Sequence, residues 1–158
     1  MLEAPDLFLT YMNGDTPRLT TNDAGARHLN SVHGVFLNDD VRALARDVLP
    51  IASLNSITLL SAELVGRSYG GGILKIEPRE ADKWLMPDVT MLAERRRELV
   101  ALKPRVRRFL QMRDLLSASA LVDDVLGLAS KLDLTSVRAD RKRLHDRRVT
   151  RGRSGGRR

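Results

Sequence analysis

The chain has 158 residues, of which 42% are hydrophobic and 4% are aromatic, and its formal net charge is +7. This length fits one domain or a small domain with an extension, and the apolar fraction is enough for an aliphatic core. The absence of cysteine excludes a disulfide framework, a thiolate zinc site and a cysteine nucleophile. Because no basic leader and no apolar stretch of roughly 18 residues is present, we expect a soluble, cytoplasmic protein with no membrane partner.

The positive charge is concentrated in the second half of the chain. Up to Thr90 the sequence contains 8 Lys/Arg and 12 Asp/Glu, whereas the remainder contains 19 and 8. We therefore expect two parts: a module over residues 1–89, and a basic helical extension over residues 90–158 with a disordered Arg/Gly tail. The terminal stretch RADRKRLHDRRVTRGRSGGRR is compatible with polyanion binding and equally with a solvated charged tail.

The first part begins with strands. Residues 8–11 and 18–21 flank the turn signal Asn13-Gly14-Asp15 and are predicted to pair as a hairpin, with a third strand near residues 32–37. Asn38 or Asp39 is predicted to cap a following helix.

A proline then divides two predicted helices. Pro50 is expected at the first position of a second helix, with Gly66 as its C-terminal cap.

Three consecutive glycines, Gly70-Gly71-Gly72, follow this second helix and precede a predicted strand over residues 73–77. Such triplets occur where backbone must approach a ligand closely or adopt a positive φ. Nucleotide-binding folds place their glycines after a strand and before a helix, so that the helix N-terminus faces the phosphates. The order here is the reverse, which excludes a phosphate-binding loop of that kind.

The second part is predicted to be helical. A helix is expected from Asp88 or Thr90 through Leu102, broken or restarted at Pro104, and further helices follow. Thr135 is expected to cap a last helix that is too polar to dock firmly. The predicted fold class is α+β: a small mixed β region with packed helices, followed by a basic helical C-terminal extension.

Two spaced segments carry a resemblance to a known family. They are PRLTTNDAGARHLNSVHGVFL and LNSITLLSAELVGRSYGGGILKIEPREADKWLMP, and together they cover most of residues 7–87. This order resembles the C-terminal, target-recognition part of adenine-N6 DNA methyltransferases from restriction-modification systems. The sequence departs from the family pattern at Trp84-Leu85-Met86-Pro87, where Leu-Pro-Ile/Val-Pro is common.

The resemblance implies a DNA-binding role without catalysis. Such enzymes use an Asn/Asp-Pro-Pro-Tyr/Phe motif and a Gly-rich strand-to-helix turn for S-adenosylmethionine, whereas all six prolines here are isolated. We therefore expect no cofactor in this chain and no methylation by it alone. The expected partners are double-stranded DNA and a methyltransferase catalytic polypeptide, whether the chain is a truncation, a split gene product or a separate specificity subunit.

Candidate DNA contacts are cations, amides, imidazoles, a stacking ring and exposed backbone N–H groups, which contact phosphates and base edges. The predicted set is Arg18, Asn22, His28, Asn30, His33, Arg67, Ser68, Tyr69, Gly70, Gly71, Gly72 and Lys75. For Arg67 the structural alternative is an ion pair with Glu63 across one helical turn.

Other chemistry has less support in the sequence. His28 and His33 are good ligand types, but no Cys or nearby Glu completes a metal site. The Asp39-Asp40 and Asp123-Asp124 pairs are expected to be caps or solvated groups rather than catalytic carboxylates. The alternative function is a non-enzymatic nucleic-acid-binding or assembly protein unrelated to methylation, in which charge asymmetry alone carries the function.

Overall fold

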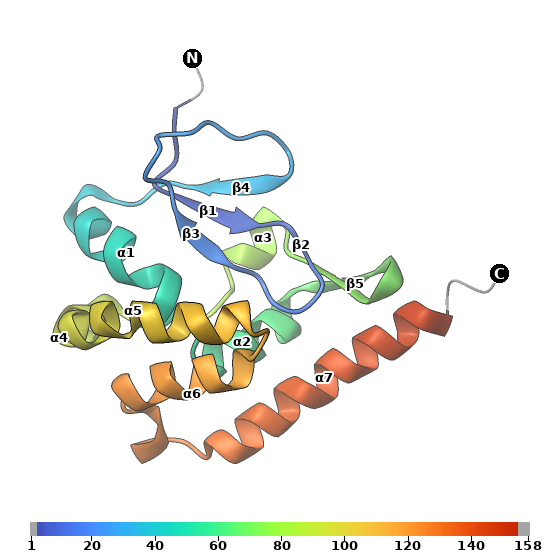
Figure 1. Ribbon diagram of the computed structural model, residues 1–158. Coiled ribbons are helices and arrows are strands. Elements are labelled where there is room, and N and C mark those ends of the chain that lie inside the picture. Colours follow the sequence, from blue (N-terminus) through green and yellow to red (C-terminus); the bar gives the residue numbers. More distant parts are fainter. Residues whose placement is uncertain (1–2, 155–158) are drawn as a thin grey trace.

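The computed structural model describes residues 3–154, which form two small sheets and a set of surrounding helices (Figure 1). The first sheet has the order β3-β1-β4, with β1 (Leu7–Thr10) between β3 (Leu19–Thr21) and β4 (Val32–Val35). Both pairings are antiparallel. The predicted hairpin and third strand are therefore confirmed, and the fold class is α+β.

The second sheet has the order β2-β6-β5 and is also antiparallel, so the predicted mixed β region contains antiparallel strands in both sheets. Its strands are β2 (Met12–Asn13), β5 (Arg67–Tyr69) and β6 (Ile73–Lys75). The sequence predicted β6 but not β5, because Arg-Ser-Tyr is short and has no apolar alternation. The glycines form a 3-10 turn, η1 (Gly70–Gly72), at the tip of the β5–β6 hairpin.

The prediction that Pro50 begins a helix is wrong. Pro50 lies in the last turn of α1 (Asp39–Ala52), and α2 (Ser56–Val65) begins after Asn55, whose side chain accepts a hydrogen bond from the Thr58 backbone N–H. Proline removes the hydrogen bond to the carbonyl four residues earlier. That carbonyl, of Arg46, accepts instead from the Thr21 hydroxyl at 2.8 Å, which ties α1 to β3.

The helices that follow are α3 (Pro78–Ala81), α4 (Val89–Glu94), α5 (Arg96–Gln111), α6 (Leu115–Val125), η2 (Leu128–Ser130) and α7 (Leu134–Ser154). The predicted break at Pro104 is wrong, because α5 continues through it and the break lies at Arg95. Pro104 is exposed within α5.

Two apolar clusters hold the fold together. The larger joins α1 and α2 to the later helices through Val48, Leu59, Leu99 and Val122, so it crosses the predicted boundary at residues 89/90. The smaller packs both sheets against Trp84, whose indole N–H donates to the Thr58 carbonyl at 2.8 Å. Each fully buried aliphatic side chain contributes about 1.5–3 kcal/mol relative to exposure.

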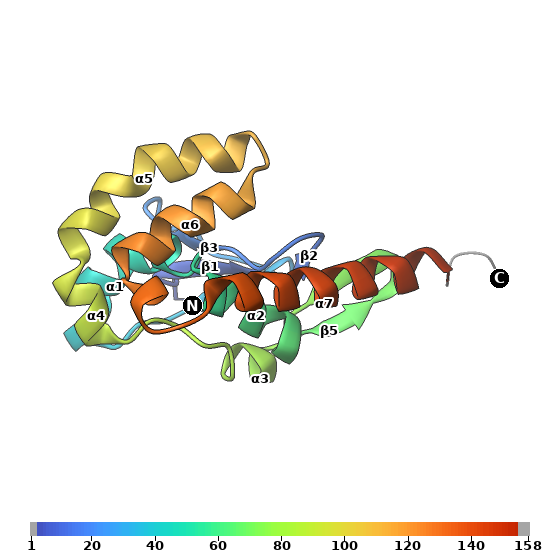
Figure 2. The same ribbon diagram turned by 90° about the horizontal axis from the view of Figure 1, so that it is seen from below.

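Helix α7 runs beside α2 and reaches the β5–β6 hairpin, with α6 between it and α5 in both views (Figures 1 and 2). The sequence predicted a weakly docked helix, but polar contacts anchor it. Arg148 and Glu63 are 4% and 2% exposed in their side chains and form an ion pair at 2.8 Å. Arg148 also donates to the carbonyls of Gly14, Asp15 and Gly72.

A second buried carboxylate anchors the start of α7. Asp123, predicted to be a cap or a solvated group, is fully buried in α6 and accepts from the Ser56 backbone N–H at the start of α2. It pairs with Arg138 of α7 at 2.8 Å. The predicted Arg/Gly tail lies, from residue 155 onward, outside the described residues.

Within residues 3–154, no single helix is both long enough and apolar enough to span a membrane. Helices α1 and α2 are long and apolar enough only when they are taken together, and they are bent by 85° relative to each other.

Candidate nucleic-acid interface

The exposed side of the second sheet carries cations and aromatic rings. Arg67 and Met12 both lie opposite Lys75, and Tyr69 lies opposite Ile73. Directly paired residues of antiparallel strands project to the same face. We call the surface formed by Met12, Arg67, Tyr69 and Lys75 the hairpin face.

Arg67 is held in place on the hairpin face by a carboxylate from α3. Its Nε donates to Glu80 Oε1 at 2.8 Å, and its Nη2 lies 2.7 Å from the same oxygen. Glu63 is therefore not its partner, contrary to the structural alternative, because Glu63 pairs with Arg148. The Arg67 side chain is still 66% exposed, so part of the guanidinium faces solvent in a fixed orientation.

Lys75 lies between two tyrosines. Its Nζ is 5.0 Å from the Tyr11 ring centroid and 5.6 Å from that of Tyr69, and 2.6 Å from Glu77 Oε1. The hydrogen bond to Glu77, followed by that to Tyr11, raises the pKa of Lys75. Tyr69 is 58% exposed, so one face of its ring is available for stacking.

The glycine triplet approaches another part of the protein, not only solvent. Gly72 is buried with φ +77, and a Cβ there would lie 3.0 Å from the Val149 Cα of α7. A Cβ at Gly152 would lie closer still to the Gly72 backbone nitrogen. Gly70 and Gly71 are exposed, with open space around them. We expected the backbone of the glycine triplet to approach DNA closely, but at Gly72 it approaches helix α7.

Two further predicted contacts, Ser68 and Asn22, lie away from the hairpin face. Ser68 lines a pocket with Arg147 and Arg148 on the side facing α7. The Asn22 side chain is buried, donating to the carbonyls of Pro5 and Ala26 and accepting from the Ala26 backbone N–H. Asn22 is therefore structural in this fold, whereas Ser68 is exposed beside that pocket.

Arg18 lies under α7 rather than on an open surface. Burial is the main reason that its pKa is lowered; nearby Asp15 acts in the opposite direction and Arg141 in the same direction. Its Nη1 is buried and has no hydrogen-bond partner in residues 3–154. The Arg18 side chain is therefore only partly exposed.

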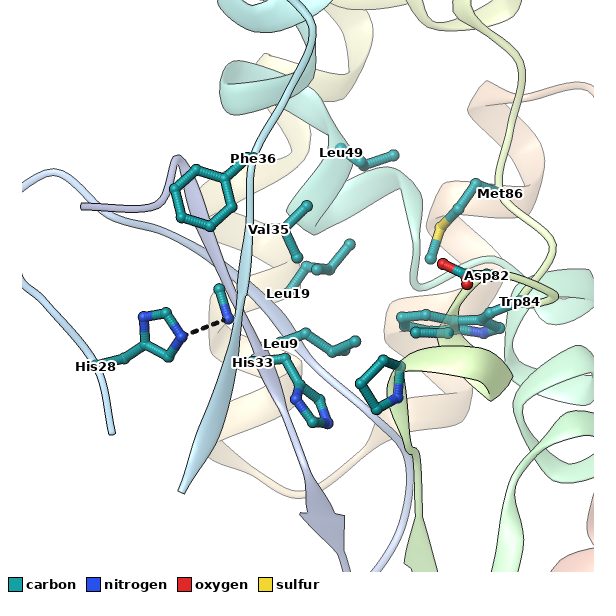
Figure 3. Close-up of a pocket in the computed structure, with 13 residues that line it drawn as sticks. Leu9, Leu19, His28, His33, Val35, Phe36, Leu49, Asp82, Trp84 and Met86 are labelled. Carbon is teal, nitrogen blue, oxygen red and sulfur yellow. Dashed lines mark hydrogen bonds between the residues drawn. The ribbon is translucent and has the colours of Figure 1, made fainter. Parts of the chain in front are cut away.

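The two histidines line an apolar cavity of about 530 Å³ between the first sheet and Trp84 (Figure 3). His28 Nε2 accepts from the Gly34 backbone N–H at 3.0 Å, and His33 Nε2 donates to the Ile76 carbonyl at 2.8 Å. Each ring thus joins two segments of the fold. Asn30, between them in sequence, is exposed.

No group of three or more His, Cys, Asp or Glu residues that could hold a metal occurs in the described part of the chain.

Sequence reasoning missed the residues that position the hairpin face. Glu80 orients Arg67, Tyr11 lies against Lys75, and Arg148 binds the carbonyl of Gly72. The Glu77-Pro78 start of α3 offered a signal for Glu80, because a capping box places a Glu three residues after the cap. No sequence pattern links Glu63 with Arg148.

S-adenosylmethionine, which a methyltransferase implies, does not fit these residues. The glycines lie at a hairpin tip between antiparallel strands and pack on α7. The cofactor turn requires glycines between a strand and the N-terminus of a helix.

These features define an α+β module with an exposed cation-and-aromatic face and attached basic helices. The family model for "Type II methyltransferase M.Eco57I, C-terminal domain" matches residues 1–126, and the chain belongs to this family. It is also similar to Type II methyltransferase M.XamI of Xanthomonas campestris pv. amaranthicola, with 35% identity over 95 residues. That match covers 58% of this chain and 17% of the relative. No solved structure matches.

The chain thus corresponds to a C-terminal portion of a restriction-modification methyltransferase. The family match ends at residue 126, so α7 lies outside the matched residues.

Proposed function

We propose that this chain is the DNA target-recognition part of a site-specific methyltransferase that modifies adenine at N6. The observation that carries the proposal is the hairpin face, where Arg67 and Tyr69 are exposed beside Lys75. An arginine can read guanine through two hydrogen bonds, and a tyrosine ring can stack on a base. Family membership supports DNA as the ligand.

Catalysis and S-adenosylmethionine binding belong, in this proposal, to a different polypeptide segment that acts with this one. The recognition part holds the duplex while the catalytic segment extrudes the base and transfers the methyl group. The related proteins do not favour the alternative of an assembly protein unrelated to methylation. We also propose that the protein functions in the cytoplasm, where the DNA lies.

The orientation of Arg67 is the main physical support for specific contact. Glu80 engages its Nε and Nη2, and Glu80 itself accepts from the Glu77 backbone N–H at 2.9 Å. A guanidinium fixed by a second, backbone-anchored group loses little conformational entropy when it binds a base edge. The same arrangement limits its contribution to non-specific attraction, because Glu80 offsets its charge.

The test is selection of duplexes from a random pool by the purified chain, followed by binding measurements. Arg67→Ala is expected to weaken binding to the selected duplex by about 1–3 kcal/mol while sparing a scrambled duplex. The matched control is Arg79→Ala, which removes an exposed arginine from neighbouring α3. If no sequence is enriched, or if Arg67→Ala retains full preference, the proposal is wrong.

The assignment of catalysis elsewhere has its own test. The purified chain is expected to incorporate no labelled methyl groups into DNA and to bind no S-adenosylmethionine in a calorimetric titration. Methylation by this chain alone would refute this part of the proposal.

A further inference from the structure

Helix α5 carries an unusual density of exposed cations. Arg95, Arg96 and Arg97 lie at its start, and Lys103, Arg105, Arg107 and Arg108 follow, all exposed. Two of these, Arg96 and Lys103, share Asp47 of α1 at 3.0 and 2.7 Å. Arg95 pairs with Glu98 at 3.8 Å.

The remaining arginines of α5 have no carboxylate partner. Within residues 3–154 no ion pair involves Arg97, Arg105, Arg107 or Arg108. A carboxylate paired with an arginine would compete with an external anion, and these four arginines form no such pair in the described residues. These side chains therefore keep their full attraction for a polyanion.

Three of these arginines share one face. At 3.6 residues per turn, Arg97, Arg105 and Arg108 fall within an arc of about 80°. The buried residues Leu99, Leu102 and Val106 occupy the opposite side, so the arginines point outward. We call Arg97, Arg105 and Arg108 the arginine face of α5.

The dimensions of the arginine face suit a nucleic-acid backbone. Arg97 and Arg108 are separated by eleven residues, or about 16 Å along the axis. A major groove is about 12 Å wide, so side chains at the two ends can contact phosphates on both of its edges. Figure 2 shows α5 at the edge of the molecule with α6 on its inner side, and the three arginines are exposed.

We propose that the arginine face of α5 is the main contact surface for the phosphate backbone of double-stranded DNA, separate from the hairpin face. This rests on the proposed function for its choice of ligand. It moves the phosphate-binding role away from the C-terminal helix, in which most of the described cations form ion pairs: Arg138, Arg141, Lys142, Arg143 and Arg148 each have a carboxylate partner.

The experiment is a salt titration of binding to a labelled random-sequence duplex. Each phosphate contact contributes about 0.9 to the slope of log affinity against log salt concentration. The variant Arg97→Gln/Arg105→Gln/Arg108→Gln is therefore expected to lower the slope by about 2–3. Glutamine keeps the length and helix propensity, and an unchanged thermal midpoint confirms folding.

The matched control removes three exposed, unpaired cations from elsewhere: Arg79→Gln/Lys83→Gln/Lys131→Gln. It changes the net charge equally and is expected to change the slope by less than about 1. Equal slopes for the two variants, an unchanged slope for the arginine-face variant, or no duplex binding by the parent would each overturn the inference.

The two proposals fail in distinguishable ways. If the pool selection enriches nothing but the salt effect is present, target recognition is wrong and the arginine face remains. If selection and the Arg67→Ala effect are present without the salt effect, only the arginine face is wrong.

Discussion

Helices α5 and α7 both contain many arginines, but they differ in whether these arginines form ion pairs within the protein. Both are rich in arginine, yet α5 packs through leucine and valine and leaves its arginines outside. In α7 arginines take part in the docking, above all Arg148, which is buried against Glu63. A count of basic residues therefore does not locate a polyanion-binding surface, because an ion pair within the protein already satisfies much of the charge.

The difference has an energetic basis. A guanidinium taken out of water requires a carboxylate and further acceptors, and Arg148 has Glu63 and three backbone carbonyls. Such an arrangement is sensitive to the loss of either partner. An exposed arginine on α5 contributes little to folding and can be exchanged without loss of stability.

The largest expected effect concerns Arg148. Arg148→Ala leaves Glu63 buried without its partner and is expected to lower the free energy of unfolding by about 3–5 kcal/mol. Arg147→Ala, the exposed neighbour, is expected to change it by less than about 0.5 kcal/mol. Urea unfolding monitored by circular dichroism measures both. A loss below about 1 kcal/mol for Arg148→Ala would show that α7 is docked by other contacts.

A smaller effect is expected at the glycine triplet. Gly72→Ala places a Cβ against the Val149 backbone at a φ of +77, and is expected to destabilise the protein by about 1–3 kcal/mol. Gly70→Ala, in open space and without a positive φ, serves as the control and is expected to be near neutral. Thermal unfolding distinguishes them; equal midpoints would contradict the close approach of α7.

The smallest expected effect is an increase in affinity for DNA. Asp47→Asn releases Arg96 and Lys103 of α5 from their shared carboxylate, so random-duplex binding is expected to strengthen about two- to fivefold with a salt slope steeper by up to about 1. Asp40→Asn on the same helix, which breaks no ion pair, is the control. No gain over that control would mean that the paired cations already contact DNA.

The pH dependence of this gain follows from the same ion pairs. Hydrogen bonding to Lys103, then to Arg96, lowers the pKa of Asp47, while partial burial opposes this. In the folded protein the Asp47 carboxylate is therefore charged at and above about pH 3.9, which is the ordinary pKa of aspartate. Its pairing with Arg96 and Lys103 is lost only as the pH falls through the lowered pKa. The difference between variant and parent is expected to be constant from about pH 8 to about pH 5.

Several local features were predictable from sequence because neighbouring residues determine them. The β1–β3 hairpin, for example, follows from the alternation around Asn13-Gly14. The helix break expected at Pro50 was misplaced because Thr21, distant in sequence, provides the donor that the Arg46 carbonyl needs.

The candidate site was predicted less completely. Arg67, Tyr69, Lys75 and the exposed glycines do lie together on or beside the hairpin face, which the glycine-rich stretch indicated. Asn22 was indistinguishable in sequence from a surface group, yet it is enclosed by backbone carbonyls. Ser68 is exposed, but it lies on the side facing α7 and not on the hairpin face. Residue type alone does not say which side of a short strand a side chain occupies.

By itself, the sequence determined the α+β class, the family resemblance and the concentration of positive charge in the second half, because composition and local periodicity carry these properties. Only the tertiary structure decided which cations are free. Whether an arginine meets a carboxylate depends on contacts such as that between Glu63 and Arg148, which no local pattern encodes. Desolvation makes such a buried pair part of the fold, and it leaves the unpaired arginines of α5 to face the solvent.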